Sequence, residues 1–250
     1  PEYHVLQLTN WRVYWKLFEE GTTDIKGVDD DFKLTDKDEI IKEAVKENKT
    51  KISKEHIKHF MNSLHFPLYH LDFETFDTAV PIFDNSRPYQ KIPFQYSLHI
   101  QSKDDKLKHH EFLAEGSGDP RPALLEALKT VIGDKGDVIV YNQSFEINVL
   151  KKLAEDFPKH KDWIQNVIDR IKDLAIPFKN LHYYNPKQKG SYSIKKLLPA
   201  ITGKGYSDLE VNNGADASMQ FFYSHIKDEL EDKEKIREHL LKYCKLDTLG

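Results

Sequence analysis

The stretch Leu68–Thr75 constrains the fold of this chain more than any other part of the sequence. Its apolar and aromatic residues are typical of a buried β-strand, but Asp72 and Glu74 interrupt them two positions apart. Because side chains alternate across a strand, both carboxylates are expected on the same face. Neighbouring carboxylates repel each other, and burying either one without a partner is unfavourable. The pair therefore indicates either a site for a divalent cation, which prefers oxygen ligands, or the solvent-exposed end of a strand.

The composition is that of a globular protein with a sizeable core. Of 250 residues, 39% are hydrophobic and 12% aromatic, which argues against a disordered chain. The net charge of −4 argues against a generic polycation that coats nucleic acid, although a local basic groove is compatible with it. A single cysteine, Cys244, excludes an internal disulfide framework and a multi-cysteine zinc site. Without a signal peptide or an apolar run of membrane-spanning length, we expect a cytoplasmic protein with no membrane partner.

Two regions differ in their sequence pattern. Residues 1–62 are rich in charge and poor in strand signals, and they carry helical patterns but no catalytic motif. One of these helices is expected to begin at Thr35, with Asp38 three residues later in a capping arrangement. We therefore expect a helical N-terminal extension or linker over 1–62 and one domain over 63–250. Because the chain ends within a helical pattern, it is expected to be a fragment of a longer protein.

The order of elements after residue 62 predicts an α/β domain. An antiparallel meander of three strands is followed by a helix and then by a short apolar strand, which is expected to lie parallel to the first. Further helices follow to the end of the chain. This order predicts a mixed sheet flanked by helices, as in the ribonuclease-H-like fold. The expected strands are 68–75, 94–100, 107–113 and 137–141, a long loop spans 76–93, and the later helices include one with Trp163, Val167, Ile168 and Ile171 and a last one from about Asp232.

Glu146 lies where the fourth expected strand passes into a helix. One interpretation is structural: Asn142 or Ser144 caps the helix, and Glu146 is a first-turn acid at the positive end of the helix dipole. The other is functional, because the inward-facing stripe of this helix continues from Glu146 through Leu150 and Leu153. In that case Asn142 is positioned to offer amide contacts to a phosphate or a base. The residues alone leave both interpretations open.

Asp247 occupies an unusual place on the last helix. It is four residues after Tyr243, so the two side chains share one face, and Ile236 and Leu240 mark that face as the one toward the core. An acid on an apolar stripe is unexpected, so Asp247 either serves a buried site or lies on a frayed helix end in water. Cys244 is expected to point away from this face and to have a structural role.

Together these acids form a series that resembles a known family. Asp-x-Glu on a first strand, Asn-x-x-Phe-Glu after a later strand and Tyr-x-x-x-Asp on a final helix resemble the three motifs of the DEDD (DnaQ-like) 3′–5′ exonuclease superfamily, whose fold is ribonuclease-H-like. Tyr243 matches its tyrosine subclass, and the resemblance covers about residues 66–250. One departure is Glu146, where most members have aspartate. The phrases 71–75, 87–90, 92–97 and 193–195 are similar to a bacterial branch in which this domain often follows a RecB-like nuclease module.

The resemblance implies a metal-dependent 3′–5′ exonuclease that releases nucleoside 5′-monophosphates from DNA or RNA. It implies two Mg²⁺ or Mn²⁺ ions about 3.5–4 Å apart, a separation typical of two-metal phosphodiester chemistry. The implied partners are a nucleic-acid 3′ end and an upstream nuclease module. The implied metal ligands are Asp72, Glu74, Glu146 and Asp247, with Tyr243 orienting the attacking water, and the candidate substrate contacts are Asn142, Ser193, Lys195 and Tyr89.

Two other functions stay open. The glutamate at position 146 favours a catalytically weak or inactive nucleic-acid-binding module of a larger nuclease protein. Alternatively, the domain positions an upstream nuclease, and residues 1–62 carry the partner surface. The substrate contacts have alternatives as well: Lys195 fits a solvated basic helix face, and Tyr89 fits core packing as well as base stacking.

Overall fold

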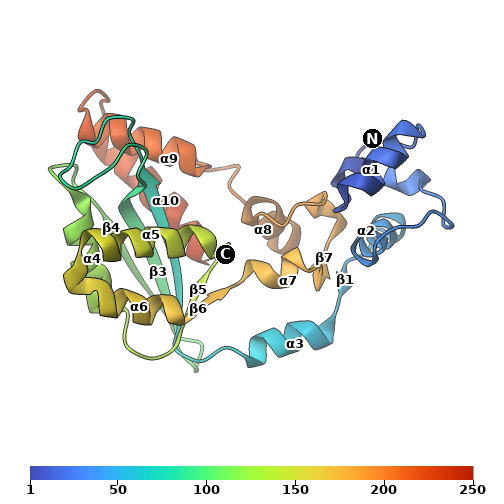
Figure 1. The fold of residues 1–250 in the computed structure, drawn as a ribbon, viewed down its shortest axis with the longest axis horizontal. Coiled ribbons are helices and arrows are strands. Elements are labelled where there is room, and N and C mark those ends of the chain that lie inside the picture. Colours follow the sequence, from blue (N-terminus) through green and yellow to red (C-terminus); the bar gives the residue numbers. More distant parts are fainter. Residues whose placement is uncertain (250) are drawn as a thin grey trace. The chain divides into compact units, whose positions relative to one another are not determined.

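The structure, a computed structural model, describes residues 1–249, and these form two compact units. The first unit combines Pro1–Ser63 with Leu174–Gly205, and the second combines Leu64–Asp173 with the chain from Tyr206 onward (Figure 1). The first segment therefore ends close to the expected boundary at residue 62. The structure differs from the expectation over residues 174–205, which were assigned to the second domain and belong to the first unit.

Strand pairing explains why the later segment joins the first unit. Strand β1 (Lys51–Ile52) pairs antiparallel with β7 (Tyr183–Tyr184), and Tyr184 is fully buried in the core of this unit. Thr35 caps α2 as its sequence pattern predicts, because its side chain accepts a hydrogen bond from the Asp38 amide. The helices of this unit are α1 (Trp11–Glu19), α2 (Asp36–Glu47), α3 (Lys54–Asn62), α7 (Ala175–Lys179) and α8 (Ile194–Thr202).

The second unit contains a five-stranded mixed sheet in the order β4-β3-β2-β5-β6. The first three strands form the predicted antiparallel meander, and β5 is parallel to β2, so both predictions are confirmed. The prediction that Ile171 continues a helix is wrong: the helix ends at Asp169, and Ile171 starts a short strand parallel to β5. The strands are β2 (Leu68–Phe76), β3 (Ile92–Gln101), β4 (Leu107–Leu113), β5 (Asp137–Val140) and β6 (Ile171–Asp173).

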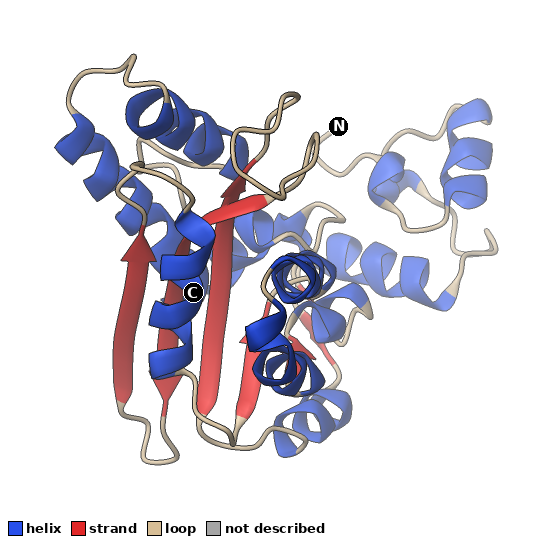
Figure 2. Ribbon diagram, turned by 60° about the vertical axis from the view of Figure 1, so that its left-hand side comes forward, coloured by secondary structure: helices blue, strands red, loops and turns tan. Residues whose placement is uncertain are grey.

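Helices cover both faces of this sheet (Figure 2). Alternation along β2 separates the faces: Tyr69, Leu71 and Phe73 enter the apolar core, while Asp72 and Glu74 point to the opposite side. The core face packs against helices that contribute leucine, isoleucine and valine side chains, and the other face packs against the last two helices. The first group is α4 (Pro120–Val131), α5 (Ser144–Asp156) and α6 (Lys161–Asp169), and the second is α9 (Gly214–Phe221) and α10 (Lys233–Leu249).

The long loop between β2 and β3 is held by buried charged groups. Arg121, only 1% exposed, forms ion pairs with Asp119 and Asp156 and donates to the Asp84 carbonyl at 3.1 Å. Gln90 Nε2 donates to the Asp156 carboxylate at 2.6 Å. The loop is thus anchored in its middle, at Asp84, and next to β3, at Gln90. Within residues 1–249, no helix combines the length and apolar character required to cross a bilayer.

Candidate metal centre

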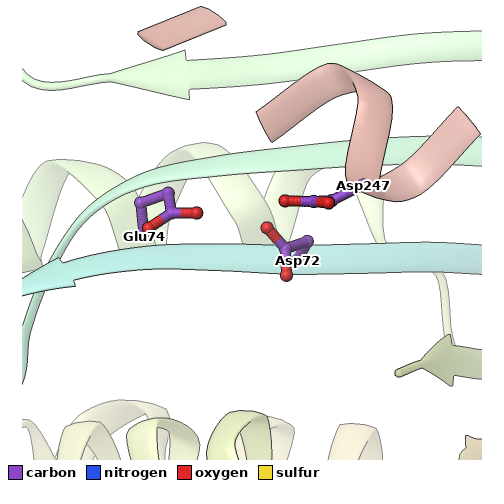
Figure 3. Close-up of side chains that lie close together, drawn as sticks. All are labelled: Asp72, Glu74 and Asp247. Carbon is purple, nitrogen blue, oxygen red and sulfur yellow. The ribbon is translucent and has the colours of Figure 1, made fainter. Parts of the chain in front are cut away.

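Three carboxylates converge on one face of the sheet. One oxygen from each of Asp72, Glu74 and Asp247 lies within 4.8 Å of the other two. The first two come from β2, where the alternation of side chains places them together, and the third comes from the last turn of α10. Figure 3 shows Asp247 pointing from the helix toward the strand pair. The structure therefore brings together three of the four acids that were expected to meet.

The local electrostatics disfavour three bare carboxylates. Burial, and then the negative charges of Asp247, Glu74 and Glu146, raise the pKa of Asp72 well above its ordinary range. Such a shift arises when the charged form loses water and faces like charges without a cation. Oxygen ligands grouped at this spacing match the donor set that Mg²⁺, Mn²⁺ and Ca²⁺ accept. The cluster therefore fits a hard divalent cation.

Glu146 is buried next to this cluster but is not one of the three converging acids. Its side chain is 2% exposed, and its Oε2 atom has no hydrogen-bond partner among the described residues. Burial, and to a smaller extent the charge of Asp173, raises the pKa of Glu146 to about 8. The negative charge of Glu146 raises the pKa of Asp72, so Glu146 interacts electrostatically with the three converging acids. Glu146 is a first-turn acid, as the structural interpretation predicts, and it is also buried and inward-facing, as the functional interpretation predicts.

The cap proposed for helix α5 differs from the observed one. The helix begins at Ser144 with Gln143 as its N-cap residue, and no side chain of the described chain caps it by a hydrogen bond. Asn142 instead adopts a left-handed backbone with φ of 68° and has an exposed side chain. The backbone N–H of Asn142 donates to Asp173 Oδ1 at 2.9 Å, and the side-chain Oδ1 of Asn142 accepts from the Ser144 hydroxyl at 3.2 Å. The position between strand and helix is as predicted, but neither Asn142 nor Ser144 is the cap.

Two tyrosines lie at the Asp247 carboxylate. Tyr243, 3% exposed, precedes it by one helical turn, as the spacing predicts. Tyr206 comes from the segment before α9, and its hydroxyl donates a hydrogen bond to Asp247 Oδ1. The two rings have centroids 6.1 Å apart. Burial, and then the charge of Asp247, raises the pKa of each tyrosine, so both hydroxyls stay protonated at neutral pH.

The expectation that Cys244 points away from the acids is wrong. Its Sγ atom lies 3.4 Å from Asp72 Oδ2 and is completely buried. The error has a geometric cause: residues three apart also share a helix face, so Cys244 lies on the same side as Asp247. Burial, and then the negative charge of Asp72, raises the pKa of the Cys244 thiol, so the thiol is protonated and donates.

The end of α10 is bound to strand β3 rather than frayed. Thr248 Oγ1 lies 2.7 Å from Ser97 Oγ and 2.8 Å from His99 Nδ1, and the helix extends through Leu249. About two helical turns before Thr248, the same helix contacts the same strand again: Gln95 Nε2 donates to the Leu240 carbonyl at 2.9 Å. These buried polar contacts fix the turn that carries Asp247. The alternative of a frayed, solvated Asp247 is therefore not what the structure shows.

The expected substrate contacts are divided between the two units. Ser193 and Lys195 belong to the first unit, at the start of α8, whereas the acids belong to the second, so their role stays a prediction. Tyr89 lies in the long loop with 70% of its surface exposed, which excludes the core-packing alternative.

Tyr206 was not predicted from the sequence, because it lies in an aperiodic segment, 41 residues before Asp247, with no motif around it.

Half of the chain matches the sequence model of a known protein family. The sequence model of the family described as "Domain of unknown function (DUF2779)" matches residues 69–193. The chain belongs to this family. The DUF2779 match contains Asp72, Glu74 and Glu146, and it ends before Tyr206, Tyr243 and Asp247.

Curated relatives with similar sequences come from Mycoplasma and Ureaplasma species. "Uncharacterized protein MG366 homolog" of Mycoplasma pneumoniae is 28% identical over 72% of this chain, and "Uncharacterized protein UU173" of Ureaplasma parvum is 28% identical over 72%. The matches cover 30% and 29% of these two relatives, so the DUF2779 chain spans less than a third of their length. No solved structure matches the chain significantly.

Proposed function

We propose that this protein is a metal-dependent 3′–5′ exonuclease of the DEDD type, with a ribonuclease-H-like fold, that hydrolyses phosphodiester bonds of DNA or RNA. The observation that carries the proposal is the convergence of Asp72 and Glu74 with Asp247. Asp72 and Glu74 lie near the start of the second unit's sequence and Asp247 lies near its end. This order along the chain matches the first and third motifs of that superfamily. Asn142 and Glu146 supply the second motif beside them.

The chemistry of the donor set supports a cation site. Asp72, Glu74 and Asp247 would hold one Mg²⁺ or Mn²⁺ through carboxylate oxygens, which are the ligands these ions prefer. Glu146, whose Oε2 has no partner among the described residues, would serve a second ion. When bound, such ions lower the pKa of a coordinated water and offset the negative charge of the phosphate. Without them, the clustered carboxylates would repel a nucleic-acid backbone.

Tyr243 would act on the attacking water. Burial and the charge of Asp247 raise its pKa, so at neutral pH its hydroxyl is a hydrogen-bond donor and not a base. A protonated hydroxyl one helical turn from the Asp247 carboxylate is able to orient a water molecule held between the acids. Release of nucleoside 5′-monophosphates follows from the family resemblance. The proposed substrate contacts are Asn142 and Tyr89, with Ser193 and Lys195 as further candidates.

One observation favours a second candidate function, a catalytically weak or inactive nucleic-acid-binding module. Glu146 is not among the converging acids, and burial raises its pKa to about 8, so near pH 7 its protonated form predominates. A protonated carboxyl is a poor metal ligand. This function predicts that a 3′-ended oligonucleotide binds but is not shortened in Mn²⁺. The exonuclease predicts stepwise shortening under the same conditions.

The test uses single-stranded DNA and RNA oligonucleotides labelled at the 5′ end, incubated with Mg²⁺ or Mn²⁺. The exonuclease predicts a ladder of products shortened from the 3′ end, with release abolished by EDTA and by Asp72→Asn or Asp247→Asn. Asp162→Asn, at an exposed acid on α6, is the matched control and is expected to keep wild-type activity. Undiminished cleavage by Asp72→Asn would overturn the assignment of the site.

A further inference from the structure

Tyr206 is the residue at the acid cluster that no motif accounts for. It is 6% exposed, and its hydroxyl donates to Oδ1 of Asp247. Its ring lies beside the ring of Tyr243, although the two tyrosines come from different segments of the chain. Tyr206 lies beyond the part of the chain that the DUF2779 family model matches. The hydrogen bond from Tyr206 to Asp247 thus links the segment before α9 to the end of α10, 41 positions later in the chain.

Asp247 lies among like charges. It sits on the last turn of a helix, and it faces two further carboxylates, those of Asp72 and Glu74, within 4.8 Å. Repulsion from like charges favours rotamers that turn its side chain toward water. A neutral hydroxyl that donates to one carboxylate oxygen opposes this rotation without adding a charge to the site.

We propose that Tyr206 is a positioning residue, and that its hydrogen bond orients the Asp247 carboxylate toward a bound Mg²⁺ or Mn²⁺ and thereby sets the affinity of the site for that cation. Carboxylates that bind metals are commonly held by hydrogen bonds from neighbouring groups, and loss of such a neighbour weakens binding. The inference rests on one part of the proposed function, the divalent cation at this cluster. It does not depend on which nucleic acid is cleaved.

The first variant is Tyr206→Phe, which removes one oxygen atom and keeps the ring that packs beside Tyr243. The matched control is Tyr69→Phe in the same unit. Tyr69 is 5% exposed, its hydroxyl also forms one hydrogen bond, with the Gly133 amide at 3.2 Å, and it faces away from the acids. Mn²⁺ binding to each protein is measured by isothermal titration calorimetry. Because neighbours of metal ligands contribute about 10–100-fold to affinity, a loss of that size is expected for Tyr206→Phe and none for Tyr69→Phe.

A second measurement separates positioning from general damage to the fold. For each variant, the rise in melting temperature is followed as Mn²⁺ is added. In Tyr206→Phe, the Mn²⁺ concentration that produces a given rise in melting temperature is expected to increase about 10–100-fold, because this rise depends on the ratio of the Mn²⁺ concentration to its dissociation constant. A purely structural defect would leave this concentration unchanged. In the nuclease assay, the same variant should need more Mn²⁺ and regain its rate at high Mn²⁺.

A second variant keeps the inference testable if the first does not fold. Tyr206→His retains an aromatic ring with an N–H donor and is expected to bind Mn²⁺ more tightly than Tyr206→Phe, or within about tenfold of wild type where only that comparison is possible. Wild-type affinity in a folded Tyr206→Phe protein would overturn the role of Tyr206 and leave the exonuclease proposal standing. Absence of Mn²⁺ binding in the wild-type protein would overturn both. Metal binding that depends on Tyr206 without any nucleotide release would support the inference and contradict only the nuclease.

Discussion

A hydrogen bond connects Thr248 on α10 with His99 on strand β3, where Thr248 Oγ1 lies 2.8 Å from His99 Nδ1. Both side chains are buried, and Ser97 lies 2.7 Å from the same hydroxyl. Because Thr248 follows Asp247 directly, these contacts fix the backbone of the helical turn that presents the acid. The position of Asp247 therefore depends on strand β3 as well as on the propensity of α10 to stay helical.

Replacing Thr248 by valine should loosen this turn. The variant keeps the shape of the side chain but leaves His99 Nδ1 without its Thr248 partner and removes one of the two contacts of Ser97 Oγ, which keeps His109. An unsatisfied buried polar group costs about 1–3 kcal/mol. Urea unfolding should report a loss of stability in this range, and Mn²⁺ binding should weaken. Thr130→Val on α4 is the control, because Thr130 is exposed and, like Thr248, bonds the carbonyl three residues earlier. Equal stability of the two variants would contradict the anchoring role.

His99 makes stability depend on pH on the acid side. Burial, and then the charges of His109 and Lys245, lower the pKa of His99 to about 4 from 6.5. Between these values the unfolded chain binds more protons than the folded one, so stability rises with pH and is lost as the pH falls from 6.5 toward 4. The stacked ring of His109, with centroids 4.3 Å apart, would then face a like charge.

The His99 contribution is measurable with His99→Asn, which does not titrate. Urea unfolding at pH 7 and pH 5 should show a smaller acid-side loss in the variant, by on the order of 2 kcal/mol. The exposed His59→Asn on α3 is the control and should keep the wild-type slope. A variant with the full acid-side loss of the wild type would show that His99 is not responsible.

Glu146 gives the metal-free protein the opposite slope. Burial raises its pKa from 4.5 to about 8, so between these values the folded chain binds more protons than the unfolded one. Stability in EDTA should therefore fall as the pH rises through this window. Glu146→Gln removes the titration, and at pH 8 it should be more stable than the wild type by on the order of a few kcal/mol. Glu238→Gln, at an exposed acid on α10, is the control and is expected to change neither the pH dependence of stability nor the stability at pH 8. A Glu146→Gln protein that is less stable than the wild type at pH 8 would refute the prediction.

Local periodicity carried most of what could be predicted about the site. The alternation of a strand placed Asp72 beside Glu74, and the spacing of four placed Tyr243 and Asp247 on one face. The same rule applied at a spacing of three would have placed Cys244 there as well. The strand order also followed from the pattern, except for β6, where Ile171 fits the helical spacing of the preceding residues and is drawn into the sheet by pairing with Val138.

Contacts between distant segments could not be predicted in this way. Tyr206 meets Asp247 because the chain returns to the second unit at that point, and no periodic pattern encodes this return. Tyr184 is buried in the first unit through pairing of two-residue strands that are too short to give a signal. The burial of Glu146 was compatible with the helical stripe, but its separation from the three converging acids depends on where α5 docks on the sheet.

Binding of a divalent cation should release protons near neutral pH. Burial raises the pKa of Glu146 to about 8, so near pH 7 this carboxyl binds a proton that a cation must displace, and burial and like charges raise the pKa of Asp72 as well. Calorimetric titration with Mn²⁺ at pH 7 in two buffers of different ionisation enthalpy should give different apparent enthalpies. Apparent affinity should rise between pH 6 and pH 8. Glu146→Gln should reduce the proton release if this residue joins the ligands, whereas Glu238→Gln should leave it unchanged. Mn²⁺ binding with the same enthalpy in both buffers would mean that the acids are already ionised, and that the cation does not act on their protons.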